Sequence, residues 1–112
     1  MRDHPVHLGE LTEQVELYHR TLTDDGSGGA TMTETLYATV WAHMRPMSGR
    51  EREEAMRSES HSSFLAVIRN RTDVVQTDIL KWDGREFNVT FIRLRGVRGL
   101  YLEMECALGA SV

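Results

Sequence analysis

Residues 78–91 alternate apolar and polar side chains on both sides of Asp83-Gly84, and this pattern limits the fold more strongly than any other. A period of two places alternate residues on one face of a β-strand. Asp-Gly favours a tight turn, because glycine adopts positive φ freely and aspartate tolerates it. The segment therefore predicts a β-hairpin in which Trp82 is buried with Phe87 and Phe91. The apolar positions are Leu80, Trp82, Phe87, Val89 and Phe91.

Four other segments have strand character, so six strands are predicted in all. Residues 64–69 are almost continuously apolar, which is typical of a central strand. The other three segments alternate, at least in part, over residues 13–22, 34–45 and 100–106. Six strands without alternating helices predict a mainly-β fold, either a small antiparallel barrel or a sandwich. A chain of 112 residues is expected to form one domain.

Three polar segments interrupt this pattern. Residues 1–10 are expected to form a loose N-terminal arm, and the acidic, glycine-rich residues 23–30 a mobile hairpin tip. Residues 46–63 begin with a proline and contain a capping-box sequence, Ser48-Gly-Arg-Glu51, which predicts a short helix over residues 50–57. That helix has little apolar surface, so we expect it to be weakly held and residues 46–63 to be mobile.

Composition excludes several classes of protein. No run approaches the roughly 18 apolar residues of a membrane helix. The first residues lack the apolar core of a signal peptide, so export by that route is not expected. The single cysteine, Cys106, has no partner for an internal disulfide and fits a reducing cytoplasm. A net charge of −4 argues against tight wrapping of nucleic acid.

The sequence contains no recognisable catalytic or cofactor-binding motif. Cys106 falls on the inward face of the last strand, where it is expected to be a small core residue. No Gly-x-Ser-x-Gly turn or phosphate-binding loop is present. The histidines are too scattered to predict a zinc site. We therefore expect no enzyme activity, no metal and no cofactor. The histidines are His4, His7, His19, His43 and His61.

Two features leave a binding role open. Trp41 lies on an expected strand with apolar residues on both faces, and it is either core beneath a loop or part of a contact surface. Residues 1–61 hold 6 Lys/Arg and 11 Asp/Glu, a net −5, whereas residues 62–112 hold 7 and 6, a net +1. This asymmetry suits stacking against copies or neighbours, or it is simply solvated loop charge. The basic run Arg93-Leu-Arg-Gly-Val-Arg98 makes a small nucleic-acid-binding barrel the alternative function.

The order of several segments resembles the head–tail joining, or head completion (stopper), proteins of long-tailed bacteriophages and gene transfer agents. The likeness spans about residues 9–108, and no single piece of it is specific. The matching segments are Gly9–Leu11 with the strand after it, Asp25–Gly29, Ala38–Ala42, Pro46–Glu51, Ile68–Asp73, Asp78–Phe87 and Tyr101–Glu105.

This resemblance implies a structural protein of the virion, located at the head–tail interface and assembled in the host bacterial cytoplasm. It implies a homo-oligomeric ring, a hexamer or dodecamer, with the portal or adaptor protein above and the tail terminator or tail tube protein below. Such a ring closes the DNA-filled head and offers a docking surface to the tail, while DNA passes the lumen without specific binding. No membrane is involved. We expect the partner interface to include Asp24, Asp25, Trp41, Arg50, Glu51, Arg52, Glu54, Met56, Arg93, Arg95 and Arg98.

Overall fold

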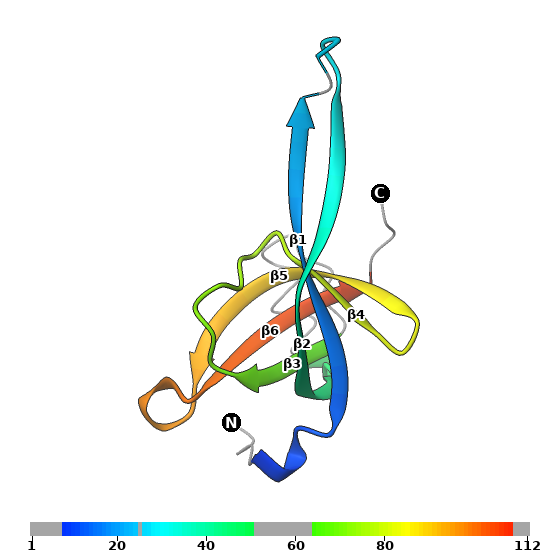
Figure 1. Cartoon of the computed structure of the whole chain (residues 1–112). Coiled ribbons are helices and arrows are strands. Elements are labelled where there is room, and N and C mark those ends of the chain that lie inside the picture. Colours follow the sequence, from blue (N-terminus) through cyan, green and yellow to red (C-terminus); the bar gives the residue numbers. More distant parts are fainter. Residues whose placement is uncertain (1–7, 25, 51–63, 109–112) are drawn as a thin grey trace.

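The computed structural model describes residues 8–24, 26–50 and 64–108, and these form a small antiparallel barrel of six strands. Neighbouring strands pair in the closed order β1-β2-β3-β6-β5-β4, so β4 returns to β1 (Figure 1). The mainly-β prediction is confirmed, with the barrel as its form. The strands are β1 (Glu13–Asp24), β2 (Ala30–Pro46), β3 (Phe64–Arg69), β4 (Ile79–Trp82), β5 (Arg85–Arg95) and β6 (Tyr101–Leu108).

The core is made of alternate side chains that point into the barrel from every strand. β3 is buried at four consecutive positions, Leu65 to Ile68, as its continuous apolar sequence predicts. Cys106 lies inside the barrel, where burial raises the pKa of its thiol to about 12. The buried core cluster comprises Val15, Leu17, Ala42, Ala66, Ile68, Leu80, Phe87, Val89, Leu102, Met104 and Cys106.

The predicted hairpin over residues 78–91 is formed by β4 and β5. Asp83 and Gly84 both have positive φ, 53° and 75°, as the Asp-Gly sequence requires of a tight turn. Phe87 is fully buried and contacts the half-buried ring of Trp82. The expected burial of Phe91 is wrong: its residue is 43% exposed.

A bulge explains the outward position of Phe91. Val89 pairs with Cys106 and Phe91 with Glu105, so Thr90 is an extra residue on β5. The Thr90 hydroxyl donates a hydrogen bond of 3.1 Å to the Glu105 carbonyl. One extra residue reverses which side chains face the core, so Phe91 turns outward although it continues the alternation of the sequence.

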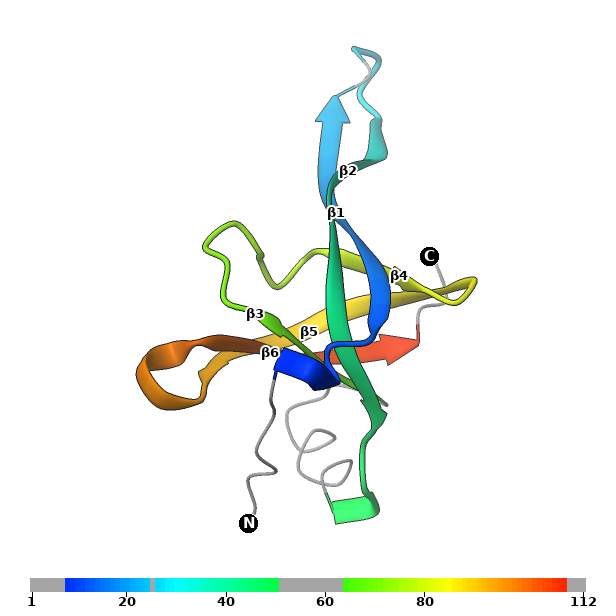
Figure 2. The same ribbon diagram turned by 60° about the horizontal axis from the view of Figure 1, so that its bottom comes forward.

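The β1–β2 hairpin extends well beyond the barrel and gives the molecule its longest dimension, 50 Å (Figures 1 and 2). β4 pairs with β1 only over Glu16–Tyr18, and β3 pairs with β2 only over Ala42–Pro46. The outer halves of β1 and β2 therefore pair only with each other within the described residues. Both strands are longer than predicted, and the connecting tip is correspondingly shorter than residues 23–30.

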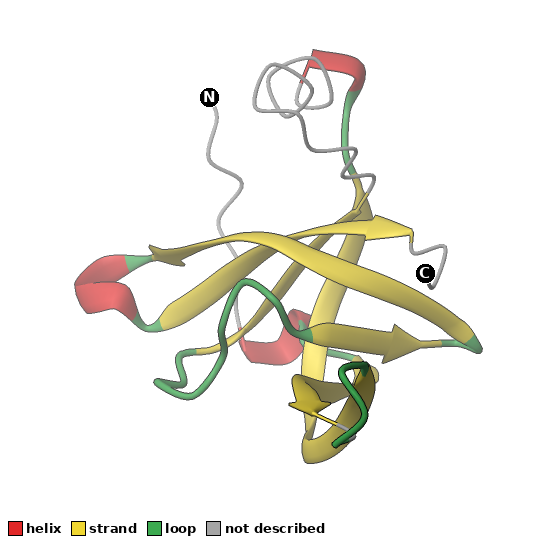
Figure 3. Cartoon of the chain, turned by 90° about the horizontal axis from the view of Figure 1, so that it is seen from above, coloured by secondary structure: helices red, strands yellow, loops and turns green. Residues whose placement is uncertain are grey.

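Short helical turns lie at the ends of the strands (Figure 3). One 3-10 turn, η1 (Leu8–Glu10), precedes β1, in a part of the chain that we expected to be a loose arm; residues 1–7 of that arm lie outside the described residues. Another, η2 (Val97–Gly99), connects β5 to β6. Gly49 and Arg50 are helical, but the remainder of the expected helix over 50–57 lies outside the described residues, as does most of residues 46–63. None of the described helices is long and apolar enough to cross a membrane.

Candidate functional site

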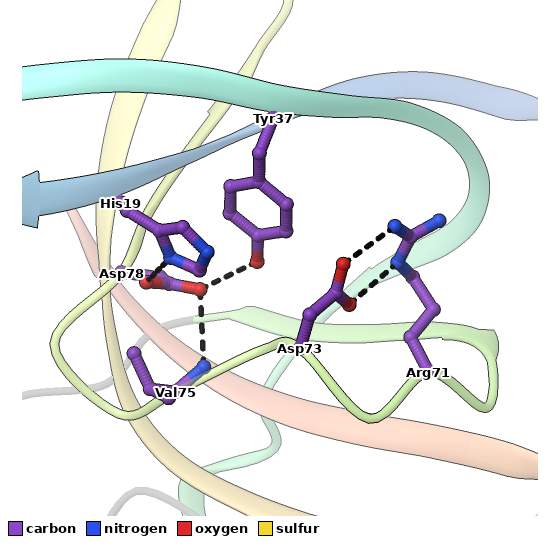
Figure 4. A network of polar contacts seen from close by, with 6 residues as sticks. All are labelled: His19, Tyr37, Arg71, Asp73, Val75 and Asp78. Atoms are coloured by element: carbon purple, nitrogen blue, oxygen red, sulfur yellow. Dashed lines mark hydrogen bonds and ion pairs between the residues drawn. The ribbon is translucent and has the colours of Figure 1, made fainter.

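A buried carboxylate, Asp78, joins three segments at the base of the projecting hairpin (Figure 4). His19 Nδ1 on β1 lies 2.8 Å from Asp78 Oδ1. The Tyr37 hydroxyl on β2 donates to Asp78 Oδ2 over 2.5 Å, and the Val75 amide donates to the same oxygen over 3.1 Å. The backbone of Asp78 also bonds to the Val75 carbonyl and the Val89 amide. We call His19, Tyr37, Val75 and Asp78 the Asp78 cluster.

The Asp78 cluster is built for rigidity. The Asp78 residue is only 1% exposed, and such a carboxylate is tolerated in a protein interior only when its oxygens accept hydrogen bonds. The rings of His19 and Tyr37 stack with centroids 3.6 Å apart. Burial, and then the bond to Asp78, raise the pKa of Tyr37 well above its ordinary value, so Tyr37 stays a donor over the whole neutral range.

The position of Tyr37 is set by a second bulge. Leu17 pairs with Ala38 but Tyr18 pairs with Leu36, which leaves Tyr37 as the extra residue of β2. The bulge lies where the hairpin leaves the barrel, and it directs the phenol toward Asp78 (Figure 4). The cluster therefore fixes the direction of the hairpin relative to β4. Nearby, Arg71 and Asp73 form an exposed bidentate ion pair at 2.9 and 2.8 Å.

Sequence reasoning did not identify the Asp78 cluster. Asp78 precedes a strand and has the appearance of an ordinary turn residue, while His19 and Tyr37 lie on two predicted strands with no local pattern that pairs them with Asp78. A His–Asp pair also occurs in hydrolases; in this cluster the carboxylate accepts a further hydrogen bond from the phenol of Tyr37. The described residues contain no group of three His, Cys, Asp or Glu side chains able to hold a metal ion.

Trp41 is 57% exposed, so it is not a core residue, and its place in a contact surface stays a prediction. It borders a cavity of about 340 Å³ beside the N-terminal end of β1. The apolar part of the lining comes from Leu11, Val40 and Trp41, and two arginines, Arg69 and Arg71, supply positive charge. We call this cavity the Trp41 groove; it is lined by Leu11, Thr39, Val40, Trp41, Arg69, Asn70 and Arg71.

The other expected interface residues are dispersed over the molecule. Asp24 lies at the hairpin tip, where its Oδ1 accepts a 2.9 Å bond from the Gly26 amide. Arg50 is exposed and follows the end of β2 that lies opposite the hairpin tip. Arg98 is exposed in η2 with a positive φ of 62°. The structure thus does not bring the expected residues into one patch, and their role in partner contacts stays a prediction. Asp25, Glu51, Arg52, Glu54 and Met56 lie outside the described residues.

Arg93 and Arg95, which support the nucleic-acid alternative, both bind one buried carboxylate. Arg93 Nε lies 2.7 Å and Arg95 Nη1 3.1 Å from the oxygens of Glu103, a residue that is 4% exposed. These two ion pairs hold β5 to β6, and the single carboxylate offsets one of the three positive charges of the run. Arg93 and Arg95 therefore stabilise the wall of the barrel. Sequence reasoning missed Glu103 because it occupies an outward strand position.

Comparisons with known proteins agree with the fold. A solution structure of protein SF1141 from Shigella flexneri 2a is 24% identical, with a TM-score of 0.72, and covers 96% of this chain and 100% of that chain. A chain from the virion of a native gene transfer agent particle is 17% identical, with a TM-score of 0.58, covering 88% and 96%. At these identities the two likenesses establish the fold alone. No curated protein matches the sequence.

The sequence itself identifies the family. Residues 6–109 match the family described as phage head completion protein, which takes in every described strand, the Asp78 cluster and the Trp41 groove. A match over nearly the whole chain leads to one conclusion: this protein belongs to the phage head completion protein family, whose members are structural proteins of the phage head.

Proposed function

We propose that this head completion protein forms a ring between the portal or adaptor and the tail, closes the DNA-filled head as a stopper, and presents the docking surface for the tail. Membership of the family supports a role in the virion, and the similar chain from a gene transfer agent particle supports a place in an assembled structure. The proposed partners are further copies of this chain, the portal or adaptor protein on one side, and a tail terminator or tail tube protein on the other.

The observation that carries this proposal is a compact barrel with a long hairpin held rigidly away from it. A ring subunit contacts two identical neighbours and a different protein on each side, so it needs several separate surfaces. The β1–β2 hairpin and the η2 connection lie at different places on the barrel (Figures 1 and 2). The Trp41 groove is a third surface, lined by residues from just before β1, from β2 and from the end of β3 onward. The Asp78 cluster presents the hairpin in one direction, which reduces the conformational entropy lost on assembly.

The charge of the chain is compatible with DNA passage. A net charge of −4 over 112 residues gives a ring lumen little tendency to hold DNA through released counterions. Two of the three arginines of the basic run are bound to Glu103, which further limits phosphate contacts. We therefore expect DNA to pass without specific binding, and a gel-shift assay at rising salt to give no steep salt dependence.

Gene deletion in a host that carries the corresponding particle genes tests the proposal. Without this chain, we expect DNA packaging to proceed, but unclosed heads that lose their DNA and complete tails to accumulate separately in electron micrographs. Expression of the intact chain should restore joined, DNA-filled particles. Normal joining in its absence contradicts the proposal. Failure to package DNA at all also contradicts it, because a stopper acts after packaging.

Deletion of residues 49–60 is a narrower test of the segment between β2 and β3. We expect the shortened chain to keep the circular dichroism spectrum and thermal midpoint of a folded barrel but to fail in head–tail joining. Restored joining by the shortened chain excludes this segment from the partner contacts and leaves the wider proposal to the gene-deletion test.

A further inference from the structure

The free part of the hairpin has two chemically different faces. Pairing across β1 and β2 places Leu22 opposite Met32 and Arg20 opposite Glu34, and Tyr18 opposite Leu36 nearer the barrel. We call these six residues the outer face. Leu22 is 66% exposed, Met32 51% and Leu36 47%. Nearer the barrel, Lys81 of β4 contacts the outer face through the Tyr18 ring and the Glu34 carboxylate. Directly opposed apolar side chains stabilise the ribbon itself, and where they are exposed they also offer an apolar contact surface.

The inner face of the same ribbon is polar. It pairs His19 with Thr35, and threonines occupy both strands at each of the next two pairs. This face therefore provides a matched control, because it belongs to the same backbone at the same distance from the barrel but has no apolar pair. The threonine pairs are Thr21 with Thr33 and Thr23 with Thr31.

The Trp41 groove is complementary to the outer face. Its apolar lining residues, Leu11, Val40 and Trp41, suit a pair of unbranched or γ-branched side chains such as Met32 and Leu22. Its exposed Arg69 suits the carboxylate of Asp24, which lies two residues after Leu22 on the same side of β1. The two surfaces are therefore complementary in apolar character and in charge.

The two surfaces cannot meet within one molecule. Met32 and Trp41 are nine positions apart on the same strand, which at about 3.3 Å per residue separates them by about 30 Å. The strand is paired along this length, so it cannot fold back on itself. The ribbon also twists between the two surfaces (Figures 1 and 2). A contact between two different surfaces of two identical chains is of the kind that generates rings.

We propose that the outer face of the hairpin of one copy docks into the Trp41 groove of a neighbouring copy, with Leu22 and Met32 against Trp41 and Asp24 near Arg69. This inference rests on the proposed ring and names the contact that closes it. Each copy donates one hairpin and receives one. The Asp78 cluster holds the donating arm in place before assembly, so the contact forms without reorganising the barrel.

Photo-crosslinking tests this contact without removing it. Met32 is replaced by the photoreactive residue p-benzoylphenylalanine, which is apolar and reacts with carbon–hydrogen bonds in contact with it. The matched control carries the same residue at Thr33, on the inner face. Each variant is mixed with isotopically heavy intact protein at high concentration, and is also incorporated into joined particles. Mass spectrometry then identifies the attached peptides and, from the label, whether they belong to another copy.

We expect the variant at position 32 to attach to heavy peptides that contain residues 39–41 or 69–71, at least ten times more often than the variant at position 33. Equal yields from both positions, or attachment of position 32 only to another protein of the particle, overturn the docking contact. If joined particles contain the protein but show no such adduct, the contact fails while the stopper function stands. If the adduct forms between purified copies but the protein is absent from particles, the stopper function fails and the contact stands.

Discussion

Asp78 gathers three hydrogen bonds on one buried side chain. It accepts from His19, Tyr37 and the Val75 amide, and it lies within the protein rather than at its surface. A carboxylate in this position stabilises the fold because it satisfies donors that are themselves partly buried. Its loss would leave those donors unpaired at the point where the hairpin meets the barrel.

Asp78→Asn tests this role. The amide keeps the shape but places an N–H donor where a carboxylate oxygen accepted, so we expect the free energy of unfolding to fall by about 2–3 kcal/mol. Urea denaturation followed by tryptophan fluorescence measures the change. The matched control is Asp73→Asn, which breaks only the exposed pair with Arg71 and should cost less than about 1 kcal/mol. Equal losses in both variants would show that the Asp78 cluster contributes no more to the free energy of unfolding than an exposed ion pair does.

Alkaline pH is expected to destabilise the protein through Cys106 and Tyr37. The pKa of each is higher in the folded chain than in the unfolded chain, so each contributes stability fully below its unfolded pKa and loses it as pH rises. For Cys106 this loss runs from about pH 9 to about pH 12. Each group adds up to about 1.4 kcal/mol per pH unit to the decline.

Urea unfolding at intervals between pH 8 and 11 measures this decline. Cys106→Ala and Tyr37→Phe should each make it shallower, whereas Tyr101→Phe, which leaves both groups in place, should not. A slope that is unchanged by both substitutions would contradict the assignment. Thiol-specific reagents give an independent reading, because Cys106 should react only as fast as the barrel opens.

Turns and bulges determine which face each strand presents. The β4–β5 turn depends on positive φ at two successive residues, and only one of them is glycine. The bulges at Tyr37 and Thr90 each add a residue to one strand and thereby reverse its faces. These local features decide the register of the whole barrel, because a slip of one residue would turn every core side chain outward.

Gly84→Ala is the test of the turn. Alanine at a φ of 75° is strained, so we expect a loss of about 1–2 kcal/mol of stability by thermal or urea denaturation. Gly9→Ala provides the control, since an added Cβ there meets no atom within 4 Å and the backbone is not left-handed. Wild-type stability in the Gly84 variant would mean that the turn adopts another conformation.

The strands were predictable from sequence, and the bulges were not. Alternation and the Asp-Gly pair identify six strands because each is a local pattern that burial enforces. Nothing in the sequence identifies Thr90 as a bulge residue, because any residue of a strand can occupy a bulge. The burial of Phe91 was therefore predicted wrongly. Asp78 and Glu103 were missed for a related reason: their partners lie far away in the sequence or across a strand pair, and no periodicity records them.

At the scale of the whole molecule, the short strands β3 and β4 create the free hairpin. They pair with only the barrel halves of β2 and β1, and their length is what leaves Leu22 and Met32 uncovered. The sequences of β1 and β2 alone do not predict that the hairpin projects from the barrel or that its two faces differ. The order of the matching segments along the chain did identify the family, because that order depends on all the strands and loops together and not on any single one.

Shortening the hairpin separates folding from assembly. We expect a chain in which residues 21–33 are replaced by Asn-Gly to keep the wild-type thermal midpoint within a few degrees, because the barrel pairs, the core and the Asp78 cluster remain. The same chain should fail to join heads to tails in the complementation assay. A large fall in the thermal midpoint would mean that the hairpin is part of the cooperative folding unit.

The bulge at Tyr37 divides each long strand into a fixed half and a free half, and this division constrains how the arm can vary in length. Two residues added to each strand of the free half would lengthen it and still point its apolar pair in the original direction. One residue added to each would aim that pair at the opposite side. Among relatives of different arm length, insertions should therefore be even-numbered on each strand, a parity rule imposed by the pleat and not by the core.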